Sequence, residues 1–164
     1  MELKKLSDIE IITTSNSKIN EVDFENLTFG NVFTDYMLVC DFENGAWQKP
    51  IITPYAPFLL DPSAKVFHYG QAIFEGMKAF KDNQDDVWLF RPDENFNRFN
   101  KSAKRMAMPE VPEDVFMGGL HRLLEIEKEW VKKGKGNTLY IRPFMIATGH
   151  GVIAAPSQSY RFMI

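Results

Sequence analysis

Segments of apolar and β-branched residues alternate with turn residues along the first half of the chain. Residues 34–42 are mostly apolar, aromatic or β-branched, and residues 47–53 resume that composition after the dipeptide Asn44-Gly45. Because Asn-Gly tolerates the positive φ of a tight turn, the two segments predict a β-hairpin. Residues 1–30 have no sustained period and predict a loosely ordered arm with one short helix or strand. The folded domain is therefore predicted to span residues 31–164.

A second hairpin is predicted after a stretch that prolines interrupt. Prolines between residues 54 and 62 break regular structure, and His68-Tyr69-Gly70 then predicts a turn that ends in glycine. Residues 73–80 form one predicted strand, the polar cluster at 81–86 turns the chain, and residues 87–90 return alongside that strand.

Two later segments have the three- and four-residue spacing of amphipathic helices. The first begins at Pro92, where Asp93 and Glu94 complement the unpaired N–H groups of a helix N-terminus, and about three to four turns are expected. The second begins at residues 112–114 and ends at residues 132–134, where two lysines and a glycine suit a helix C-terminus. The apolar positions that define the first helix are Phe96, Phe99, Ala103 and Met106.

The chain closes with two more extended segments. Residues 138–147 predict a strand, residues 149–151 a glycine-rich loop, and residues 160–164 an internal strand. Hairpins followed by two helices and further strands favour an α+β fold, with a mostly antiparallel sheet and the two helices packed on one face. Because a C-terminus usually lies in a solvated segment, the strand-like ending predicts truncation near a domain boundary, with a natural strand-terminated domain as the alternative.

Composition and charge narrow the classes of protein. A chain of 164 residues with 45% hydrophobic positions is long enough for one domain with a real core. Nineteen basic against 22 acidic residues, without a basic cluster, make nucleic acid an unexpected partner. The single cysteine, Cys40, lies in an apolar run and is predicted to be a small buried residue.

Targeting and metal signals are missing from the sequence. No signal peptide begins the chain and no apolar run is long enough to span a bilayer, so a soluble cytoplasmic protein without a membrane partner is expected. His68, His121 and His150 have spacings that match no common ligand motif, so no metal site is expected.

Tyr140 and Arg142 form the clearest chemical pair. Alternate side chains of a strand share a face, so these two are expected to point the same way, roughly 6–7 Å apart. A guanidinium can bind a carboxylate with two parallel N–H···O bonds and a phenol can add a third donor, which makes the pair a candidate carboxylate receptor. From spacing alone, an edge-strand arginine paired with a surface acid is the commoner explanation.

Tyr69 and Arg98 carry weaker signals. Tyr69 presents a hydroxyl next to a glycine, which permits close approach to a ligand but equally permits an ordinary turn. Arg98 lies in the first predicted helix, where a solvated side chain is the default and a phosphate ligand is the alternative. The G-x-S-x-G elbow, the P-loop and the G-x-G-x-x-G fingerprint are all absent, which disfavours the classes that use them.

Taken together, several motifs resemble the branched-chain aminotransferases. The runs Phe-Glu-Gly-Met-Lys-Ala-Phe at 74–80 and Tyr-Ile-Arg-Pro at 140–143 are the most specific. The resemblance extends from about residue 20 onward. It implies a pyridoxal-phosphate enzyme of fold type IV, in which a small N-terminal α/β domain, here residues 31–164, and a larger C-terminal domain enclose the cofactor in a homodimer. The similar segments are residues 27–30, 33–37, 67–80, 89–92, 95–98 and 139–143.

The resemblance also implies an activity and roles for residues. The activity is reversible amino transfer between leucine, isoleucine or valine and 2-oxoglutarate, so the small-molecule partners are these amino acids, their 2-oxo acids and glutamate. Arg98 would hold the cofactor phosphate, Tyr140 the substrate α-carboxylate and Arg142 the distal carboxylate of glutamate. An aromatic wall edged by polar groups suits a pocket that must accept both apolar and charged side chains. The other implied pocket residues are Phe29, Tyr69, Phe74 and, in a loop that reaches the neighbouring subunit's site, Val152.

One part of the family pattern is missing. The lysine that binds the cofactor lies in the C-terminal domain of the family, and none of the lysines here occupies its place. No catalytic residue is therefore assigned, this chain alone is expected to be inactive, and the surface around Tyr69 and Arg142 is expected to be exposed. The alternatives are another fold type IV enzyme, either a D-amino-acid aminotransferase or an aminodeoxychorismate lyase, and a non-catalytic self-associating domain.

Overall fold

Two sheets make up the framework of the molecule. The computed structural model describes residues 9–164. The first eight residues of the predicted arm, and with them the prediction that no signal peptide begins the chain, lie outside the described residues. The larger sheet has the order β1-β4-β2-β10-β9-β5, with β3 paired to β2 beside this path. β1 runs parallel to β4, and the other pairings are antiparallel. Its strands are β1 (Glu10–Ile11), β2 (Tyr36–Glu43), β3 (Ala46–Trp47), β4 (Ile51–Pro54), β5 (Ala72–Phe74), β9 (Phe144–Ala147) and β10 (Tyr160–Met163).

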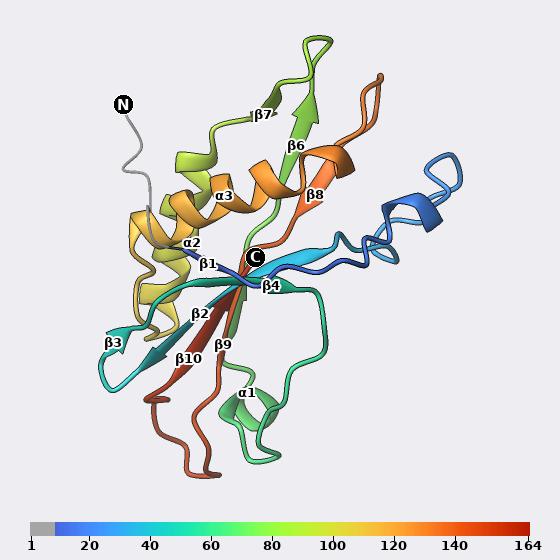
Figure 1. The fold of residues 1–164 in the computed structure, drawn as a ribbon. Coiled ribbons are helices and arrows are strands. Elements are labelled where there is room, and N and C mark those ends of the chain that lie inside the picture. Colours follow the sequence, from blue (N-terminus) through green and yellow to red (C-terminus); the bar gives the residue numbers. More distant parts are fainter. Residues whose placement is uncertain (1–8) are drawn as a thin grey trace.

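The smaller sheet and the helices complete the fold. The smaller sheet has the order β7-β6-β8, and both of its pairings are antiparallel. α2 and α3 lie over one face of the larger sheet, whereas α1 lies at its far end (Figure 1). The remaining strands are β6 (Met77–Lys81), β7 (Val87–Leu89) and β8 (Leu139–Ile141). The helical segments are η1 (Ile19–Glu21), α1 (Lys65–Tyr69), α2 (Pro92–Arg105), η2 (Asp114–Gly118), α3 (Gly119–Ile126) and η3 (Lys128–Trp130).

The predicted α+β class, with its mostly antiparallel sheets and few helices, is confirmed. The first hairpin forms as predicted, with β2 antiparallel to β3 and β4, and its turn places Asn44 at φ 53° and Gly45 at φ 79°. These positive angles are the ones that Asn-Gly accepts at low cost. Local turn chemistry was therefore enough to predict this part of the fold.

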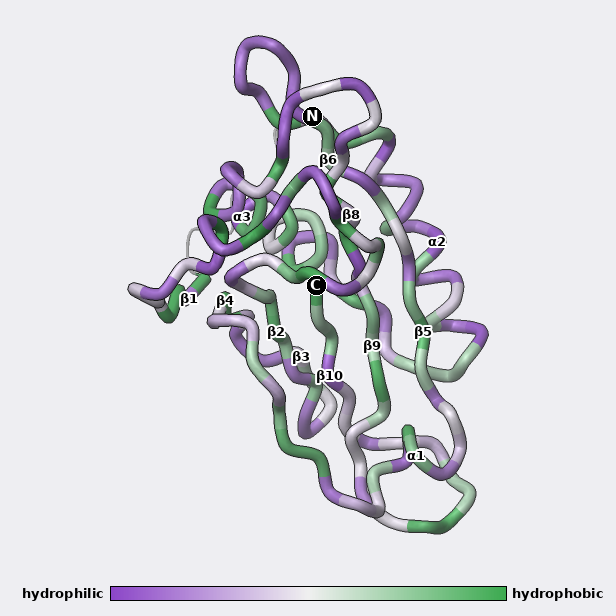
Figure 2. The backbone as a smooth tube through the Cα atoms, turned by 90° about the vertical axis from the view of Figure 1, so that its right-hand side faces the viewer, coloured by the Kyte–Doolittle hydropathy of each residue, from purple (hydrophilic) through white to green (hydrophobic). Residues whose placement is uncertain are grey.

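Helix and sheet meet in an aromatic core. The ring of Phe162 in β10 lies 5.4 Å from that of Phe99 in α2 and 5.5 Å from that of Phe116 in η2, between centroids. All three side chains are fully buried, and aromatic pairs at such distances add to the stabilisation that burial provides. Figure 2 shows the hydrophobic colouring concentrated on inner strands such as β2 and β9, and hydrophilic colouring over much of α2.

Two strands predicted as continuous are each divided between the sheets. Residues 73–80 break at Glu75-Gly76 into β5 and β6, and residues 138–147 break at Arg142-Pro143 into β8 and β9. β5 pairs with β9 in the larger sheet and β6 with β8 in the smaller one, so the two chains pass from sheet to sheet side by side. The prediction of single strands was wrong because apolar composition does not show where a strand changes its sheet. Pro143, which lacks an N–H, interrupts the ladder of hydrogen bonds at this point.

Two further predictions are corrected. The predicted turn at residues 68–70 is the C-terminal end of α1, whose last residue is Tyr69 and whose cap, Gly70, has φ 61° in the left-handed conformation that favours glycine. The second helix does not continue to residue 134: it starts with the π-helical turn η2, and α3 ends at Ile126. Beyond that point only the short 3-10 helix η3 follows, and the side chains of residues 127 and 130 bond to residues 36 and 35 at the start of β2.

The side chain of Asp35 joins the N-terminal arm to the rest of the fold. Asp35 accepts hydrogen bonds from the Ser17 hydroxyl at 2.6 Å, the Lys18 amide at 2.8 Å and the indole of Trp130 at 3.0 Å. Burial acts to raise the pKa of Asp35, but these hydrogen bonds outweigh it and lower the pKa. The arm is thus bound to the same place at which the helical segment after α3 ends.

Cys40 is buried and free, as predicted, and burial raises the pKa of its thiol to about 12. The thiol is therefore neutral at physiological pH. Within residues 9–164, no helix is long and apolar enough to cross a membrane.

Glu127 gives the fold a pH-dependent stability. It is only 2% exposed and accepts a hydrogen bond from the backbone N–H of Tyr36, and burial raises its pKa from 4.5 to about 7. The folded state therefore binds a proton that the unfolded state has already released between these pH values, and stability falls as pH rises through this range. At pH 8 the free energy of unfolding of Glu127→Gln should exceed that of the wild type by roughly 2–3 kcal/mol, and at pH 5 the two should differ little. Urea unfolding at both pH values measures this difference.

The matched control for this measurement is Glu125→Gln, a neighbouring change at an exposed position of α3. It should leave the pH dependence of the unfolding free energy unchanged. If the free energies of unfolding of the wild type and Glu127→Gln differ by the same amount at pH 5 and pH 8, the assignment is contradicted.

Candidate active site

The candidate carboxylate-receptor pair, Tyr140 and Arg142, lies where the chain leaves the smaller sheet. Tyr140 belongs to β8 and Arg142 follows it directly, and the Arg142 guanidinium donates a hydrogen bond of 2.7 Å to the Tyr140 hydroxyl. The same guanidinium lies 4.2 Å from the ring centroid of Phe74, at the end of β5. The side chains therefore share a face, as strand alternation predicted, although Arg142 itself lies just outside the strand.

Arg142 has no acidic partner in the part of the chain that the structure describes, because every ion pair found there joins other residues. The commoner explanation of such a residue, an arginine paired with a surface acid, therefore does not apply within the described residues. A guanidinium with free donors beside a phenol remains able to take an external carboxylate.

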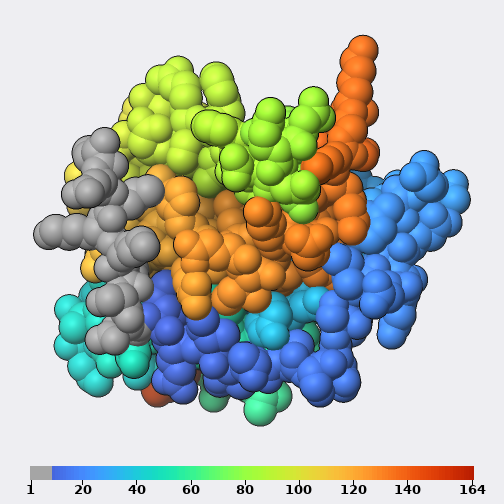
Figure 3. Space-filling view, turned by 45° about the horizontal axis from the view of Figure 1, so that its top comes forward, coloured from blue at the N-terminus to red at the C-terminus, as the bar shows by residue number. Residues whose placement is uncertain are grey.

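The arm supplies the next wall of this group. The ring of Phe29 lies 5.1 Å from that of Tyr140 at an interplanar angle of 79°, an edge-to-face contact. Figure 3 shows the arm, in blue, lying against the orange segment that contains β8. Phe74 and Tyr140 thus lie against the guanidinium and Phe29 against Tyr140, and Phe29 and Phe74 keep most of their surface open to solvent.

Gly76 makes room for this arrangement. A Cβ added at Gly76 would overlap the Tyr140 hydroxyl and lie 3.0 Å from Cζ of the same ring. A side chain here would therefore displace the phenol from its place beside Arg142. We did not predict Gly76 as a site residue, although a glycine inside a strand-like run signals a close approach of two chain segments.

Arg98 lies in a second polar group, beside the crossing, by which we mean the residues 75–76 and 142–143 where the two chain segments pass from one sheet to the other. Its Nε and one terminal nitrogen donate to the two carboxylate oxygens of Glu75 at 3.0 and 2.9 Å. The Asn95 amide donates to the same carboxylate at 2.9 Å. Burial acts to raise the pKa of Glu75, but the bonds from Arg98 and Asn95 outweigh it and lower the pKa, so the carboxylate is charged. Neither Glu75 nor Asn95 was predicted from the sequence.

Tyr69 and Val152 form a third group. The Tyr69 hydroxyl donates to the backbone carbonyl of Val152, and the Lys65 ammonium bonds the carbonyls of Ile153 and Ala155 at 2.8 and 2.7 Å. These bonds fasten the loop after β9 to α1. Because α1 lies at the end of β9 remote from β8 (Figures 1 and 2), the structure does not bring Tyr69 and Val152 together with Arg142 in one chain.

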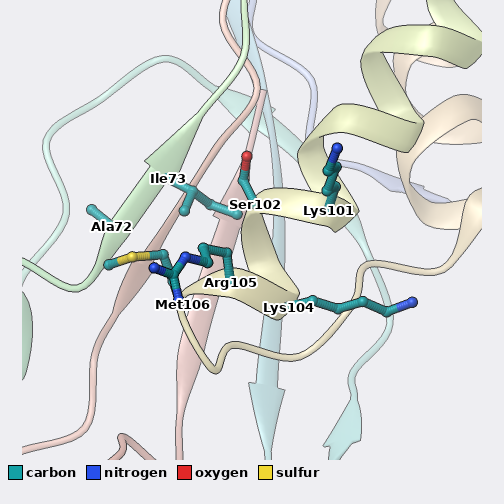
Figure 4. Close-up of a pocket in the computed structure, with 7 residues that line it drawn as sticks. All are labelled: Ala72, Ile73, Lys101, Ser102, Lys104, Arg105 and Met106. Atoms are coloured by element: carbon teal, nitrogen blue, oxygen red, sulfur yellow. The ribbon is translucent and has the colours of Figure 1, made fainter.

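A hollow of about 770 Å³ lies elsewhere, between β5 and the C-terminal end of α2 (Figure 4). Lys101 and Lys104 point away from the hollow in this view, and Lys104 forms an ion pair of 3.2 Å with Glu110. None of the predicted site residues lines it. The lining residues are Ala72, Ile73, Lys101, Ser102, Lys104, Arg105 and Met106.

The chain is similar over most of its length to known aminotransferases, although no family model matches it. It is 53% identical over 143 residues to branched-chain-amino-acid transaminase 1 of Bacillus subtilis, covering 87% of this chain and 40% of that protein. It is 41% identical over 162 residues to branched-chain-amino-acid aminotransferase 2 of the same organism, covering 98% of this chain and 44% of the relative. The chain belongs to the branched-chain aminotransferase family. The resemblance deduced from its motifs is thereby confirmed.

Solved structures of the same family show the same fold. The branched-chain amino acid aminotransferase of Escherichia coli matches with a TM-score of 0.57 at 20% identity, over 79% of this chain and 38% of that one. A branched-chain aminotransferase of Thermobaculum terrenum, described in its pyridoxal-phosphate holo form, matches with the same TM-score at 17% identity, over the same shares of the two chains. The chain spans about 40% of the length of the curated relatives it matches, and the match covers their N-terminal part.

The space at Gly76 yields a stability prediction. Gly76→Ala should lower the free energy of unfolding by about 1–3 kcal/mol, because the new methyl group forces Tyr140 out of its place. In a Tyr140→Phe background the same change should cost clearly less, since the overlapping oxygen is gone. Denaturant unfolding of the four proteins measures this coupling. Equal costs in both backgrounds would show that Tyr140 is not what excludes a side chain at residue 76.

Proposed function

We propose that this chain supplies the substrate-recognition part of a pyridoxal-phosphate-dependent branched-chain aminotransferase. The enzyme transfers an amino group reversibly between L-leucine, L-isoleucine or L-valine and 2-oxoglutarate. The observation that carries the proposal is the pair of Tyr140 and Arg142, which has no acidic partner among the described residues and is edged by Phe29 and Phe74. The names of the relatives support it.

The two amino donors make opposite demands on this pocket. Leucine carries an apolar side chain, which Phe29 and Phe74 can cover, whereas glutamate carries a second carboxylate, for which the guanidinium of Arg142 provides two parallel donors. Tyr140 would hold the α-carboxylate that both donors share. Its hydroxyl accepts the bond from Arg142, so its own proton is free to be donated outward.

Arg98 is chemically suited to the cofactor phosphate. Two of the five N–H donors of its guanidinium are used by Glu75, which leaves three for an anion, and its side chain is 59% exposed. When bound, pyridoxal phosphate supplies an electron sink for the bonding electrons of the substrate α-carbon. Within this proposal Arg98 holds the phosphate, no catalytic residue is assigned to this chain, and the cofactor-binding lysine belongs to the C-terminal domain of the family.

The assembly in this proposal is a homodimer in the cytoplasm that serves branched-chain amino acid metabolism. Tyr69 and Val152 are bonded to each other, partly open to solvent, and remote from Arg142 in their own chain. We therefore assign them to the active site of the neighbouring subunit, where they would close the apolar wall of the substrate pocket. The net charge of −3 gives no support for nucleic acid as a partner.

Comparison of amino donors tests the proposal. The complete enzyme that contains this chain should transfer the amino group of L-leucine to 2-oxoglutarate in the presence of pyridoxal phosphate and should leave D-alanine unused. Turnover of D-alanine would instead identify a D-amino-acid aminotransferase. Release of pyruvate from aminodeoxychorismate would identify a lyase, and no activity with any of these substrates would favour a non-catalytic domain.

Arg142 gives a prediction that separates the two physiological donors. Arg142→Met should raise the KM for glutamate about 10–100-fold, because the distal carboxylate loses its charged partner. The KM for leucine should change much less, since its apolar side chain makes no use of the guanidinium. Arg122→Met, the same substitution at an arginine paired with Glu125 on α3, should alter neither constant. Equal rises for both donors would refute the assigned role.

A further inference from the structure

Glu75 is the centre of a polar network for which the proposed reaction has no direct use. Its side chain is 13% exposed, far less than that of its partner Arg98 at 59%. Besides the two bonds from Arg98, the carboxylate accepts bonds from the Asn95 amide at 2.9 Å and from the Gly76 backbone N–H at 3.3 Å. Asn95 also donates to the carbonyl of Gly76 at 3.2 Å. The partly buried carboxylate is therefore held by Asn95 and Gly76 as well as by Arg98.

The bonds to Arg98 use one edge of its guanidinium. Nε and one terminal nitrogen face the carboxylate in the two-pronged geometry that arginine forms with acids. The other terminal nitrogen lies away from this edge, and its two N–H groups are free to receive an anion. A long, exposed arginine side chain otherwise samples many rotamers, and ordering it on ligand binding reduces affinity. Glu75 removes that disorder in advance.

We infer that Glu75 is a positioning residue, which holds the guanidinium of Arg98 so that its free edge faces the phosphate of the cofactor. This inference rests on the proposed function, because it takes Arg98 to be a phosphate ligand. The crossing between β5 and β6 fixes Glu75, Glu75 fixes Arg98, and Arg98 binds the phosphate. Cofactor affinity thus depends on a residue that does not touch the cofactor.

Two other roles for Glu75 make different predictions. If the carboxylate only joined α2 to the crossing, its loss would lower stability without favouring one ligand over another. If its negative charge mainly repelled the phosphate, its loss would tighten phosphate binding. The four hydrogen bonds that the carboxylate accepts, two of them from a cation, neutralise much of this repulsion, so the loss of orientation should dominate.

The test compares pyridoxal phosphate with pyridoxal, which lacks the phosphate. Dissociation constants for both ligands are measured by equilibrium absorbance titration of the apo form of the complete enzyme, for the wild type, Glu75→Gln, Glu75→Ala and Arg98→Ala. Asp41→Asn is the matched control, because Asp41 forms the same two-pronged ion pair with Arg161 at 2.7 and 2.8 Å between β2 and β10. Thermal unfolding of each variant reports stability separately.

The expected result is a graded loss of preference for the phosphorylated ligand. Glu75→Ala should weaken pyridoxal phosphate binding about tenfold and Glu75→Gln, which can still accept one bond, about threefold. Affinity for pyridoxal should stay within about twofold of the wild type, and Asp41→Asn should leave the preference unchanged. Adding Glu75→Ala to Arg98→Ala should cause no further loss, since the orientation no longer matters.

Several results would overturn the inference. Equal weakening for both ligands would assign Glu75 to structure, and tighter pyridoxal phosphate binding would assign it to repulsion. Should Glu75→Ala fail to fold, Glu75→Gln and the shortened Glu75→Asp decide the matter, and wild-type preference in both would reject the role. If Arg98→Ala keeps the wild-type preference for pyridoxal phosphate over pyridoxal, Arg98 does not bind the phosphate, and the inference is rejected. A wild type that binds neither ligand rejects the proposed function itself.

Discussion

The paired crossing of two chain segments between the sheets is the constraint on which the rest of the structure depends. The backbone N–H of Glu75 donates to the carbonyl of Pro143 at 2.9 Å, so the segment between β5 and β6 stays bonded to the segment between β8 and β9 while both change sheet. This bond preserves the antiparallel pairing through a point where neither chain belongs to a sheet. Without it, the N–H of Glu75 and the carbonyl of Pro143 would need other partners.

The crossing also distributes the chemistry of the site. Three consecutive residues meet three different partners: Phe74 lies against Arg142, Glu75 binds Arg98, and Gly76, which has no side chain, makes room for Tyr140. The residues proposed for substrate recognition and for phosphate recognition are thereby attached to one short piece of backbone. A shift of this segment would disturb both, which physically couples the carboxylate receptor to the candidate phosphate ligand.

The core fixes the crossing in space. Phe99 of α2 packs on Phe162 of β10, so the helix that carries Arg98 is held on the larger sheet by the residue next to it in sequence. On the other side, Phe29 of the arm packs on Tyr140, and Asp35 binds the arm to Trp130. Close packing makes such a framework resist displacement, which is what a binding site needs if its donors are to be in place before the ligand arrives.

The sequence alone determined the parts of this protein that depend on local chemistry. Asn44-Gly45 predicted the first hairpin because only a few residue types accept its backbone angles, and Pro92 with two acids predicted the start of α2. Strand alternation predicted that Tyr140 and Arg142 would be neighbours, and the motifs around them were specific enough to predict the family.

The tertiary structure decided everything that depends on residues far apart in the chain. Whether residues 73–80 form one strand or two depends on which partner pairs with each half, and composition carries no record of that choice. Glu75 and Gly76 acquired their importance in the same way, since an acid and a glycine in an apolar run have no evident partner until Arg98 and Tyr140 are placed beside them. Hydrogen bonds and steric exclusion act over a few ångströms of space rather than along the sequence, so the folded arrangement was needed to identify these two residues.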